Sequence, residues 1–533
     1  MGTISPHRLS VLSKEDCWLL FRQRAFGLGN EERPNVVAIR KEIVKKCGGV
    51  PLAAKALGGL MRFKSEEKEW LHVKENYCLM LERLPQNMRC LRCLRHLFLS
   101  RCPLIEMPPK IGQLTNLKTL NKFIVGKSTD WSLLAELKCL NLQGELCISY
   151  LERVRNPMDA KEANLVGMQN LSQLQLNWKY EFAEYESQEN VESEAQENVK
   201  SELVLEALQP HPNLKELIVR GYKGTQFPLW MRGSYLQNVV NIQLSRCNNC
   251  LQLPPLGQLP LLQSLEVNGM KVVGCIENEY PGGGGFPSLE ELAVRYCPKL
   301  EGLSREEGRE LFPRLRKIDI IDCPKLSYPY LSAPKELSLL GECTTMVLNS
   351  ISNLNGLTSL TIIGYADKMV CFPKDFLRNL TLLESLVIEN YHELKVLPRD
   401  LASLVTLKSL KIEGCPKLES LPEEGLRGCE SFQSLHIINC RELERQCEKG
   451  KGEDWYKIAH IPEITIKIGL LQNGHKCLKF AFYTVDGMNL WLPMTGCCHA
   501  LWVTMAAASI EVAVASNALL VGRFWVVHGY EII

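Results

Sequence analysis

One hydrophobic pattern recurs along most of the chain, from about residue 94 to residue 440. It reads L-x-x-L-x-L-x-x-C and is often followed by P-K-L-x-x-L-P. The clear copies are LRHLFLSRC (94–102), VVNIQLSRC (239–247), LEELAVRYC (289–297), LRKIDIIDC (315–323), LKSLKIEGC (407–415) and FQSLHIINC (432–440), and looser copies begin at Leu171, Leu214, Leu262, Leu357 and Leu383. Neighbouring copies lie about 23 to 27 residues apart, which is the period of leucine-rich repeats. The pattern predicts an α/β fold, a solenoid in which each repeat adds one strand to a curved parallel sheet.

The repeated cysteine has a structural interpretation in such a stack. Each strand points its two L-x-L residues into a continuous core, and the cysteine takes a turn position where a small side chain with a weak donor fits beneath the next coil. We expect these six thiols to be reduced and buried: Cys102, Cys247, Cys297, Cys323, Cys415 and Cys440. The C-x-x-C pairs Cys90/Cys93 and Cys247/Cys250 could be zinc half-sites, but no histidines follow at metal-ligand spacing, which favours structural thiols and no metal.

The residues that flank the inward leucines are predicted to line the concave face of the solenoid. They mix both charges with isoleucine and valine, which fits recognition of a protein better than of a phosphate backbone. We predict a protein-binding face that includes Arg295, Asp319, Lys411, Glu413 and His436. The first four are expected on successive strands, and reversal of their charges is expected to change binding and leave the fold intact, because exposed substitutions cost little stability. The alternative is an ordinary solvated sheet.

The first eighty residues predict helices rather than repeats. SKEDCWLLFRQRAF (13–26) begins with a capping box, Ser13 and Asp16, and places apolar residues on one helical face. A second helix is expected over residues 36–46, ended by Gly48 and Gly49, where a left-handed residue is needed. Pro51 then begins a third helix at a position where its missing N–H costs nothing.

These segments, LSKEDCWLLFRQRAF followed by IVKKCGGVPLAAKALGGLMRFKSEEKEW, resemble the plant NB-ARC leucine-rich-repeat disease-resistance proteins over about seventy residues. GVPL (49–52) corresponds to the GLPL motif of that family. There the proline packs against the adenine of ADP or ATP, which implies a nucleotide-contacting role for Pro51 and its neighbour Leu52. The simpler interpretation is a proline that starts a helix. CEKGKGEDWYKIAHIPEITI (447–466) resembles the carboxyl end of the same receptors.

The sequence lacks the complete motif that would hold the phosphates of a nucleotide. A phosphate loop needs G-x-x-x-x-G-K-[ST]. The one similar segment, Gly126-Lys127-Ser128-Thr129, has Asn121 at the leading glycine position, and its FIVGK resembles the start of the family's repeat region. We therefore expect a chain truncated in its nucleotide-binding half, with no bound cofactor and with the family's ADP/ATP switch lost.

These observations divide the chain into three parts: a partial NB-ARC helical subdomain (1–80), the repeat region (81–468) and an unmatched tail (469–533), which could be aberrant. EFAEYESQENVESEAQENVKSE (181–202) interrupts the repeats and is predicted to be a solvated, flexible loop. In the tail, residues 501–522 are apolar and long enough to span a bilayer, but Glu511 lies at their centre, which argues against a membrane helix.

Charge and termini limit the function classes. The formal net charge is +2, from 62 basic and 60 acidic residues, so no global field draws the protein to nucleic acid or membrane. MGTISPHRLS has no apolar signal core, and with the reduced thiols this predicts a cytoplasmic protein. The resemblance implies an intracellular immune receptor that recognises a pathogen effector or a guarded host protein, or a fragment whose partner is a full-length receptor of the family. The alternatives are a repeat scaffold or adaptor and a non-functional receptor fragment; no catalytic grouping suggests an enzyme.

Overall fold

The computed structural model describes residues 12–25 and, with short gaps, residues 84–178 and 191–467, together with isolated residues and short strands elsewhere. The chain forms two compact units. One comprises residues 1–79, 94–97 and 470–533, and the other comprises residues 80–93 and 98–469. The second unit contains the repeat array. The boundaries expected at residues 80 and 468 stay predictions.

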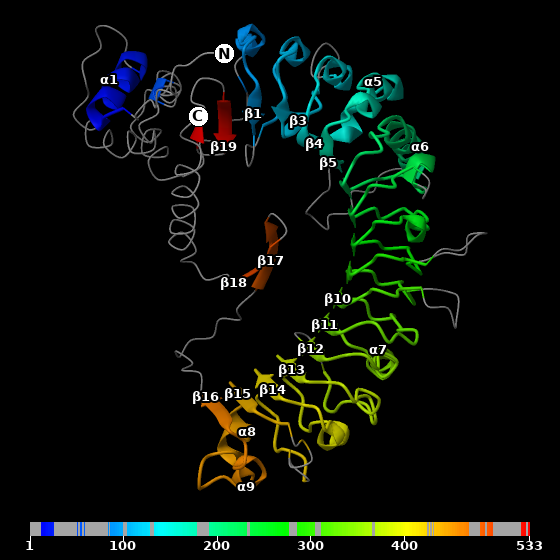
Figure 1. Cartoon of the computed structure of the whole chain (residues 1–533), viewed down its shortest axis with the longest axis vertical. Helices are drawn as coiled ribbons and strands as arrows, with labels where there is room; N and C mark the ends of the chain where they lie inside the picture. Colours follow the sequence, from blue (N-terminus) through cyan, green and yellow to red (C-terminus); the bar gives the residue numbers. More distant parts are fainter. Residues whose placement is uncertain are drawn as a thin grey trace, which may run out of the picture. The chain divides into compact units, whose positions relative to one another are not determined.

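Fourteen strands of the second unit form one continuous sheet in sequence order, from β3 to β16. Their bounds are β3 Lys122–Ile124, β4 Gly144–Ser149, β5 Leu171–Asn177, β6 Glu216–Arg220, β7 Asn241–Ser245, β8 Ser264–Asn268, β9 Glu291–Arg295, β10 Lys317–Ile321, β11 Glu336–Leu340, β12 Ser359–Ile363, β13 Ser385–Glu389, β14 Ser409–Glu413, β15 Ser434–Ile438 and β16 Glu463–Lys467. Within this unit the sheet curves, with the strands on the inner side and α5, α6 and α7 on the outer side (Figure 1). The predicted solenoid with a curved parallel sheet is confirmed.

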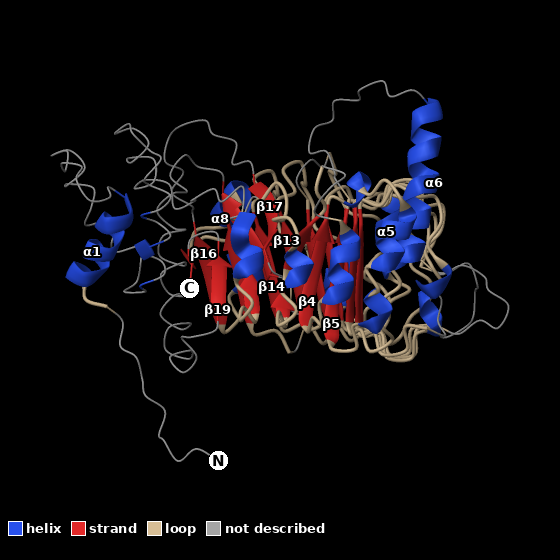
Figure 2. Ribbon diagram, turned by 90° about the horizontal axis from the view of Figure 1, so that it is seen from above, coloured by secondary structure: helices blue, strands red, loops and turns tan. Residues whose placement is uncertain are grey.

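The outer side of the sheet consists of loops and short helices (Figure 2). The α-helices are α5 Pro157–Glu162, α6 Val191–Ala207, α7 Thr345–Ile351, α8 Arg441–Gln446 and α9 Trp455–Ile458, and the 3-10 helices are η1 Gln86–Cys90, η2 Ile111–Gln113, η3 Leu134–Cys139, η4 Leu151–Arg153, η5 Leu165–Gly167, η6 Leu229–Met231, η7 Leu256–Gln258 and η8 Arg399–Ser403. The remaining strands are β1 His96–Phe98, β2 Thr119–Leu120, β17 Phe480–Val485, β18 Met488–Pro493, β19 Phe524–His528 and β20 Glu531–Ile532. β17 pairs with β18 and β19 with β20, both antiparallel.

The core is built from the L-x-L residues, as the repeat pattern predicts. Leu292, Ile318 and Leu337 stand in register on β9, β10 and β11, and all three are buried. The strands β6 to β15 bury their second and fourth residues because side chains alternate between the two faces of a strand. The repeats therefore stack their leucines and isoleucines into one continuous apolar core.

Five of the six predicted ladder cysteines are buried and carry free thiols, and Cys102 lies outside the described residues. Two of these thiols donate to backbone carbonyls on the preceding strand: Cys323 Sγ lies 3.7 Å from the oxygen of Val294, and Cys440 Sγ lies 3.7 Å from that of Ile412. Burial raises the pKa of Cys247 to about 12. The hydrogen bonds of Cys323 and Cys440 link one repeat to the next.

The chain leaves many strands through a residue in the left-handed conformation, directly before the ladder position. At Arg246, Tyr296, Asp322, Asn390 and Asn439 the φ angle lies between 50° and 61° although none of these is a glycine. Glycine takes the equivalent place in other repeats, as at Gly414 (φ 68°), because it reaches this region without steric cost. This turn aims the following side chain back beneath the sheet.

Carboxylates on the outer side link successive repeats. Each of these acids accepts hydrogen bonds from backbone amides of the preceding repeat: Asp159 from Leu134 and Ala135 (3.1 and 2.9 Å), Glu136 from Gly112 (3.0 Å), Asp400 from Leu377 (2.7 Å) and Asp454 from Leu421 (2.7 Å). Amides at the start of a short helix lack partners within the helix, so an acceptor from the neighbouring repeat satisfies them. The stack is thus held by polar contacts as well as by its core.

The prediction of a flexible loop over residues 181–202 is wrong for its second half. Residues 191–202 belong to α6, and residues 181–190 lie outside the described part of the chain. Glutamate, alanine, glutamine and lysine are good helix formers, and the helix continues into Val204 and Leu205, which are buried. The carboxylate of Glu202 also accepts from both the backbone N and Oγ1 of Thr225, at 2.7 Å each. Packing and hydrogen bonds to the next repeat therefore order this acidic segment.

In the first unit, α1 spans Lys14–Ala25 and confirms the predicted capping box. Ser13 Oγ accepts from the backbone amide of Asp16 at 3.0 Å and donates to its carboxylate at 2.7 Å. Phe21 is fully buried. Gly58 lies so close that a Cβ there would fall 2.5 Å from the carbonyl oxygen of Phe21. The helix expected at 36–46 lies outside the described residues.

Candidate protein-binding face

The concave face consists of the side chains of β3 to β16 that point away from the repeat core. On most strands these are the first, third and fifth residues, and they are half-buried, as on β7, β8 and β12 to β15. Rigid strands hold every one of them at a fixed spacing. Such a surface is wide enough to bind another protein.

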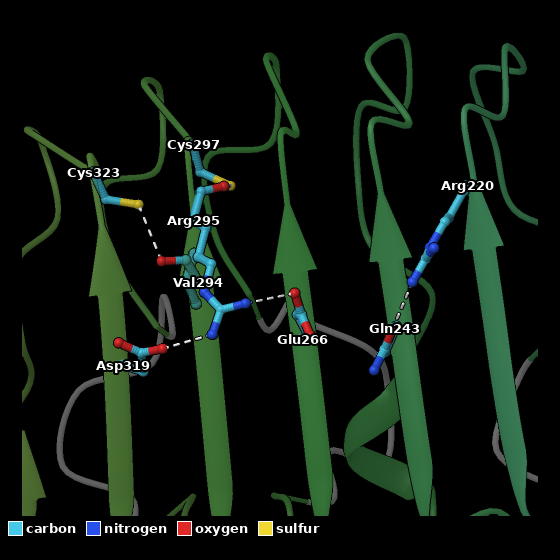
Figure 3. Close-up of polar contacts among 8 residues, drawn as sticks. All are labelled: Arg220, Gln243, Glu266, Val294, Arg295, Cys297, Asp319 and Cys323. Atoms are coloured by element: carbon cyan, nitrogen blue, oxygen red, sulfur yellow. Dashed lines mark hydrogen bonds and ion pairs between the residues drawn. The ribbon is translucent and has the colours of Figure 1, made fainter. Parts of the chain in front are cut away.

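Arg295 is at the centre of an ion-pair cluster on this face. Its Nη1 lies 2.8 Å from Glu266 Oε1 on β8, and its Nη2 lies 2.7 Å from Asp319 Oδ2 on β10 (Figure 3). The residue is only 7% exposed, and its Nε has no acceptor in the part of the chain that the structure describes. Two carboxylates thus neutralise this cation within the sheet.

The structure places the five predicted face residues on β9, β10, β14 and β15, and two expectations about them need correction. Arg295 is not an exposed position, because it is buried between two carboxylates. Reversal of its charge would therefore not leave the fold intact. The four charged residues also do not occupy successive strands, since Lys411 and Glu413 share β14.

Lys411 forms a second cluster of the same kind. Its Nζ lies 2.8 Å from Glu389 Oε1 on β13 and 2.7 Å from Glu413 Oε2 on its own strand. Burial alone would lower the pKa of Lys411, but the hydrogen bonds to the two glutamates outweigh it and raise the pKa. The Lys411 side chain is 34% exposed, so a partner can reach this cluster, which carries one net negative charge.

His436 on β15 lies next to this second cluster. It stands in register with Lys411 on β14 and with Thr465 on β16, and it is half-buried. Its imidazole therefore faces the same solvent as Lys411. The sequence pattern placed it correctly on the concave face; its role in binding stays a prediction.

The expectation of exposed isoleucine and valine on the face holds only in part. Ile321 on β10 is buried at 3% exposure, and Leu340 on β11 is buried at 6%. Val387 and Ile438 are half-buried. The accessible part of the face is therefore more polar than the sequence suggested.

An amide-rich stretch covers β4 to β7, and the sequence reasoning missed it. Gln175 Nε2 donates to Asn177 Oδ1 at 3.1 Å, and Asn177 Nδ2 lies 3.2 Å from Cys147 Sγ and 3.4 Å from Ser149 Oγ. Arg220 on β6 projects into this stretch. The signal was present in the looser repeats, LSQLQLN and LKELIVR, whose strand positions carry amides and one arginine.

The predicted nucleotide contacts are not assembled into a site among the described residues. Pro51 is helical and exposed, and Leu52 lies outside them. The phosphate-loop-like segment begins just after β3 of the sheet, and the side chain of Asn121 accepts from the backbone amide of Leu99 at 2.7 Å. Asn121 is thus tied to the repeat stack rather than placed for a phosphate.

The C-x-x-C pairs differ in their surroundings. Cys90 and Cys93 are exposed, whereas Cys247 and Cys250 are buried, and the Cys250 thiol donates to the carbonyl of Gly224 at 3.2 Å. Within the described ranges there is no cluster of three or more metal-ligating side chains. In those same ranges no helix is both long and apolar enough to cross a bilayer. Residues 501–522 lie outside them.

The parallel strands, the period of the repeats and the ladder define the class: a leucine-rich-repeat solenoid. The family model described as "R13L1/DRL21 LRRs" matches residues 134–270. Disease resistance protein RGA2 of Solanum bulbocastanum is 32% identical over an alignment of 705 residues, which covers 88% of this chain and 69% of that protein. RGA4 of the same species is 33% identical over 702 residues, covering 87% and 69%. A solved LRR protein of Leptospira interrogans is 18% identical with a TM-score of 0.33, covering 72% of this chain and 98% of that one.

The chain belongs to the family of plant disease resistance proteins. Its match to RGA2 covers most of both proteins at 32% identity. That alignment is longer than the 533 residues of the chain, so the relative contains internal segments that this chain lacks.

Proposed function

We infer that this chain is the recognition part of a plant immune receptor, and that it binds a pathogen effector or a guarded host protein on its concave face. One observation carries this proposal: a rigid fourteen-stranded sheet presents half-buried polar and charged side chains on its concave face. The chain belongs to a family of disease resistance proteins, in which such a face suits recognition of another protein. The partner meets a surface fixed before binding, which lowers the entropic cost of association.

Binding rather than catalysis is the role that this face supports. Its two strongest charge clusters, around Arg295 and Lys411, are internally paired and serve to shape the surface. The protein acts in the cytoplasm, where its buried thiols remain reduced.

The ADP/ATP switch of the NB-ARC family does not operate through this chain. The segment that resembles a phosphate loop continues directly from a strand of the repeat sheet, and Asn121 is committed to a contact with Leu99. The internal segments that RGA2 has and this chain lacks support the same proposal.

Affinity capture from infected leaf extract tests the recognition role. The bait is the purified chain, compared with a concave-face variant, Gln243→Arg/Thr361→Arg, and with an outer-side control, Met158→Glu on α5. Both sets of positions accept polar groups, because Gln243 and Thr361 are half-buried and Met158 is 54% exposed. We expect a specific protein to be retained by the wild type and by the control but lost from the concave-face variant. Equal retention by all three baits would contradict the proposal.

A further inference from the structure

Arg220 and Arg295 occupy equivalent positions on the concave face. Arg220 ends β6, two residues after Ile218, and Arg295 ends β9, two residues after Ala293. Ala293 is flanked in register by Glu266 and Asp319, the two carboxylates that bind Arg295. The repeat geometry thus supplies an internal comparison for Arg220.

Amides stand around Arg220 where carboxylates stand around Arg295. Ile218 is flanked in register by Gln175 on β5 and Gln243 on β7. Arg220 itself stands between Asn177 and Ser245, which are also neutral.

The guanidinium of Arg220 is largely unused by the fold. It presents five N–H donors, yet among the described residues its one side-chain contact is a long hydrogen bond from Nη2 to Gln243 Oε1 at 3.4 Å (Figure 3). No carboxylate of the described residues lies within ion-pair distance of it, and the side chain is half-buried. A cation that is partly withdrawn from water and lacks a counter-charge favours an incoming anion.

The amides beside it are held in fixed orientations. Asn177 accepts from Gln175 and donates toward Cys147 and Ser149, so both the donor and the acceptor ends of its amide are engaged. Asparagine and glutamine side chains can donate to and accept from peptide groups. The surroundings of Arg220 therefore suit a polypeptide backbone that carries a single acid.

We propose that Arg220 is the anchor for a carboxylate of the protein partner, an aspartate or glutamate side chain or a free C-terminus, and that the amides of β5 to β8 bind the peptide groups around it. This deepens the proposed function and rests on it. Arg295 occupies the equivalent position, but its guanidinium is already paired with two acids of the chain itself, Glu266 and Asp319.

A polyanion such as nucleic acid does not fit the same place. Glu145, Glu216 and Glu266 lie on β4, β6 and β8 of the same face. Burial, and to a smaller extent the charge of Glu145, raise the pKa of Glu216, as expected where carboxylates on one face repel each other. A chain of phosphates would pass over these carboxylates, whereas one carboxylate can reach Arg220 alone.

A phage-displayed library of random 12-residue peptides, selected on the purified full chain, tests the proposal. Selected peptides are synthesised and their Kd values are measured by fluorescence anisotropy. The two test variants are Arg220→Ala and Gln175→Glu/Gln243→Glu. The first removes the anchor, and the second copies the acids around Arg295, so that Arg220 pairs with carboxylates of the chain itself. Lys138→Ala is the matched control, an outer-side cation on η3 that already has its own carboxylate, Glu162, at 3.0 Å. Lys411→Ala, a concave-face cation eight strands further along, tests whether binding uses another part of the same face.

We expect an acidic residue at one shared position of the selected peptides and a Kd about ten- to a hundredfold higher for both test variants, since hydrogen bonds to a charged group are lost. Lys138→Ala should leave the Kd unchanged. Peptides without an acidic preference, no selectable peptide, or binding unaffected by both test variants would overturn the proposal. Loss in Lys411→Ala but not in Arg220→Ala would overturn the anchor and leave the concave-face function standing. Equal binding by all variants would overturn both.

Discussion

Replacement of Arg295 by alanine should destabilise the middle of the solenoid. The change leaves Glu266 on β8 and Asp319 on β10 without the cation that they share. In the wild type the guanidinium nitrogens of Arg295 lie 2.8 Å from Glu266 and 2.7 Å from Asp319. Breaking a buried ion pair costs about 3–5 kcal/mol. The two acids remain 24% and 20% exposed, so water can solvate them in part. We therefore expect a loss of about 2–3 kcal/mol, below the fully buried range.

Hydrogen–deuterium exchange is the assay of choice, because long repeat arrays need not unfold in a single step. Amides of β8 to β10 should exchange about 30- to 150-fold faster in Arg295→Ala, which is the same free energy expressed as a rate. The control is Arg220→Ala. This change removes an arginine from the equivalent position, where it leaves no carboxylate of the described residues without its cation. Equal effects of the two variants, or no change over β8 to β10, would refute the reasoning.

Three further predictions follow from individual groups. Glu216→Gln should raise stability at neutral pH: the folded pKa of Glu216 is raised, so its favourable contribution is complete below the unfolded value of 4.5 and is lost as pH rises through the folded pKa. Urea unfolding at several pH values checks this, and a gain that persisted at pH 3 would contradict it. A soluble maleimide should label exposed Cys90 and Cys371 in the native protein and spare Cys415, read by peptide mass spectrometry; rapid labelling of Cys415 would contradict the buried ladder. Calorimetry should detect no ATP or ADP binding, and low-micromolar binding that Pro51→Ala weakens would show that the nucleotide site is functional.

The repeat period determined most of the fold. The alternation of buried residues on β7 and on β12 to β15 follows directly from L-x-L spacing, and the cysteines fall where the ladder requires them. The loop predicted over residues 191–202 is part of α6. The prediction gave the acidic composition more weight than the helix propensity and the buried Val204 and Leu205 that follow.

The candidate site could be predicted only as a list of outward positions. The repeat pattern places Arg220 and Arg295 at outward positions, but their difference depends on residues 23 to 45 positions away in the chain that the register brings alongside. The outer-side carboxylates, such as Asp159 and Asp400, have the same origin, since their amide partners belong to a different repeat. Pairing between repeats is a property of the stack and not of any single motif.

Site-specific photo-crosslinking in leaf tissue tests the central claim, that a protein docks on the concave face. A benzophenone amino acid replaces Asn241 on β7, which is half-buried on that face, or Met158 on α5, which is 54% exposed on the outer side. After irradiation, adducts are separated and identified by mass spectrometry. The account predicts a discrete protein adduct from position 241 and none from position 158. An adduct from position 158 with none from position 241 would contradict it.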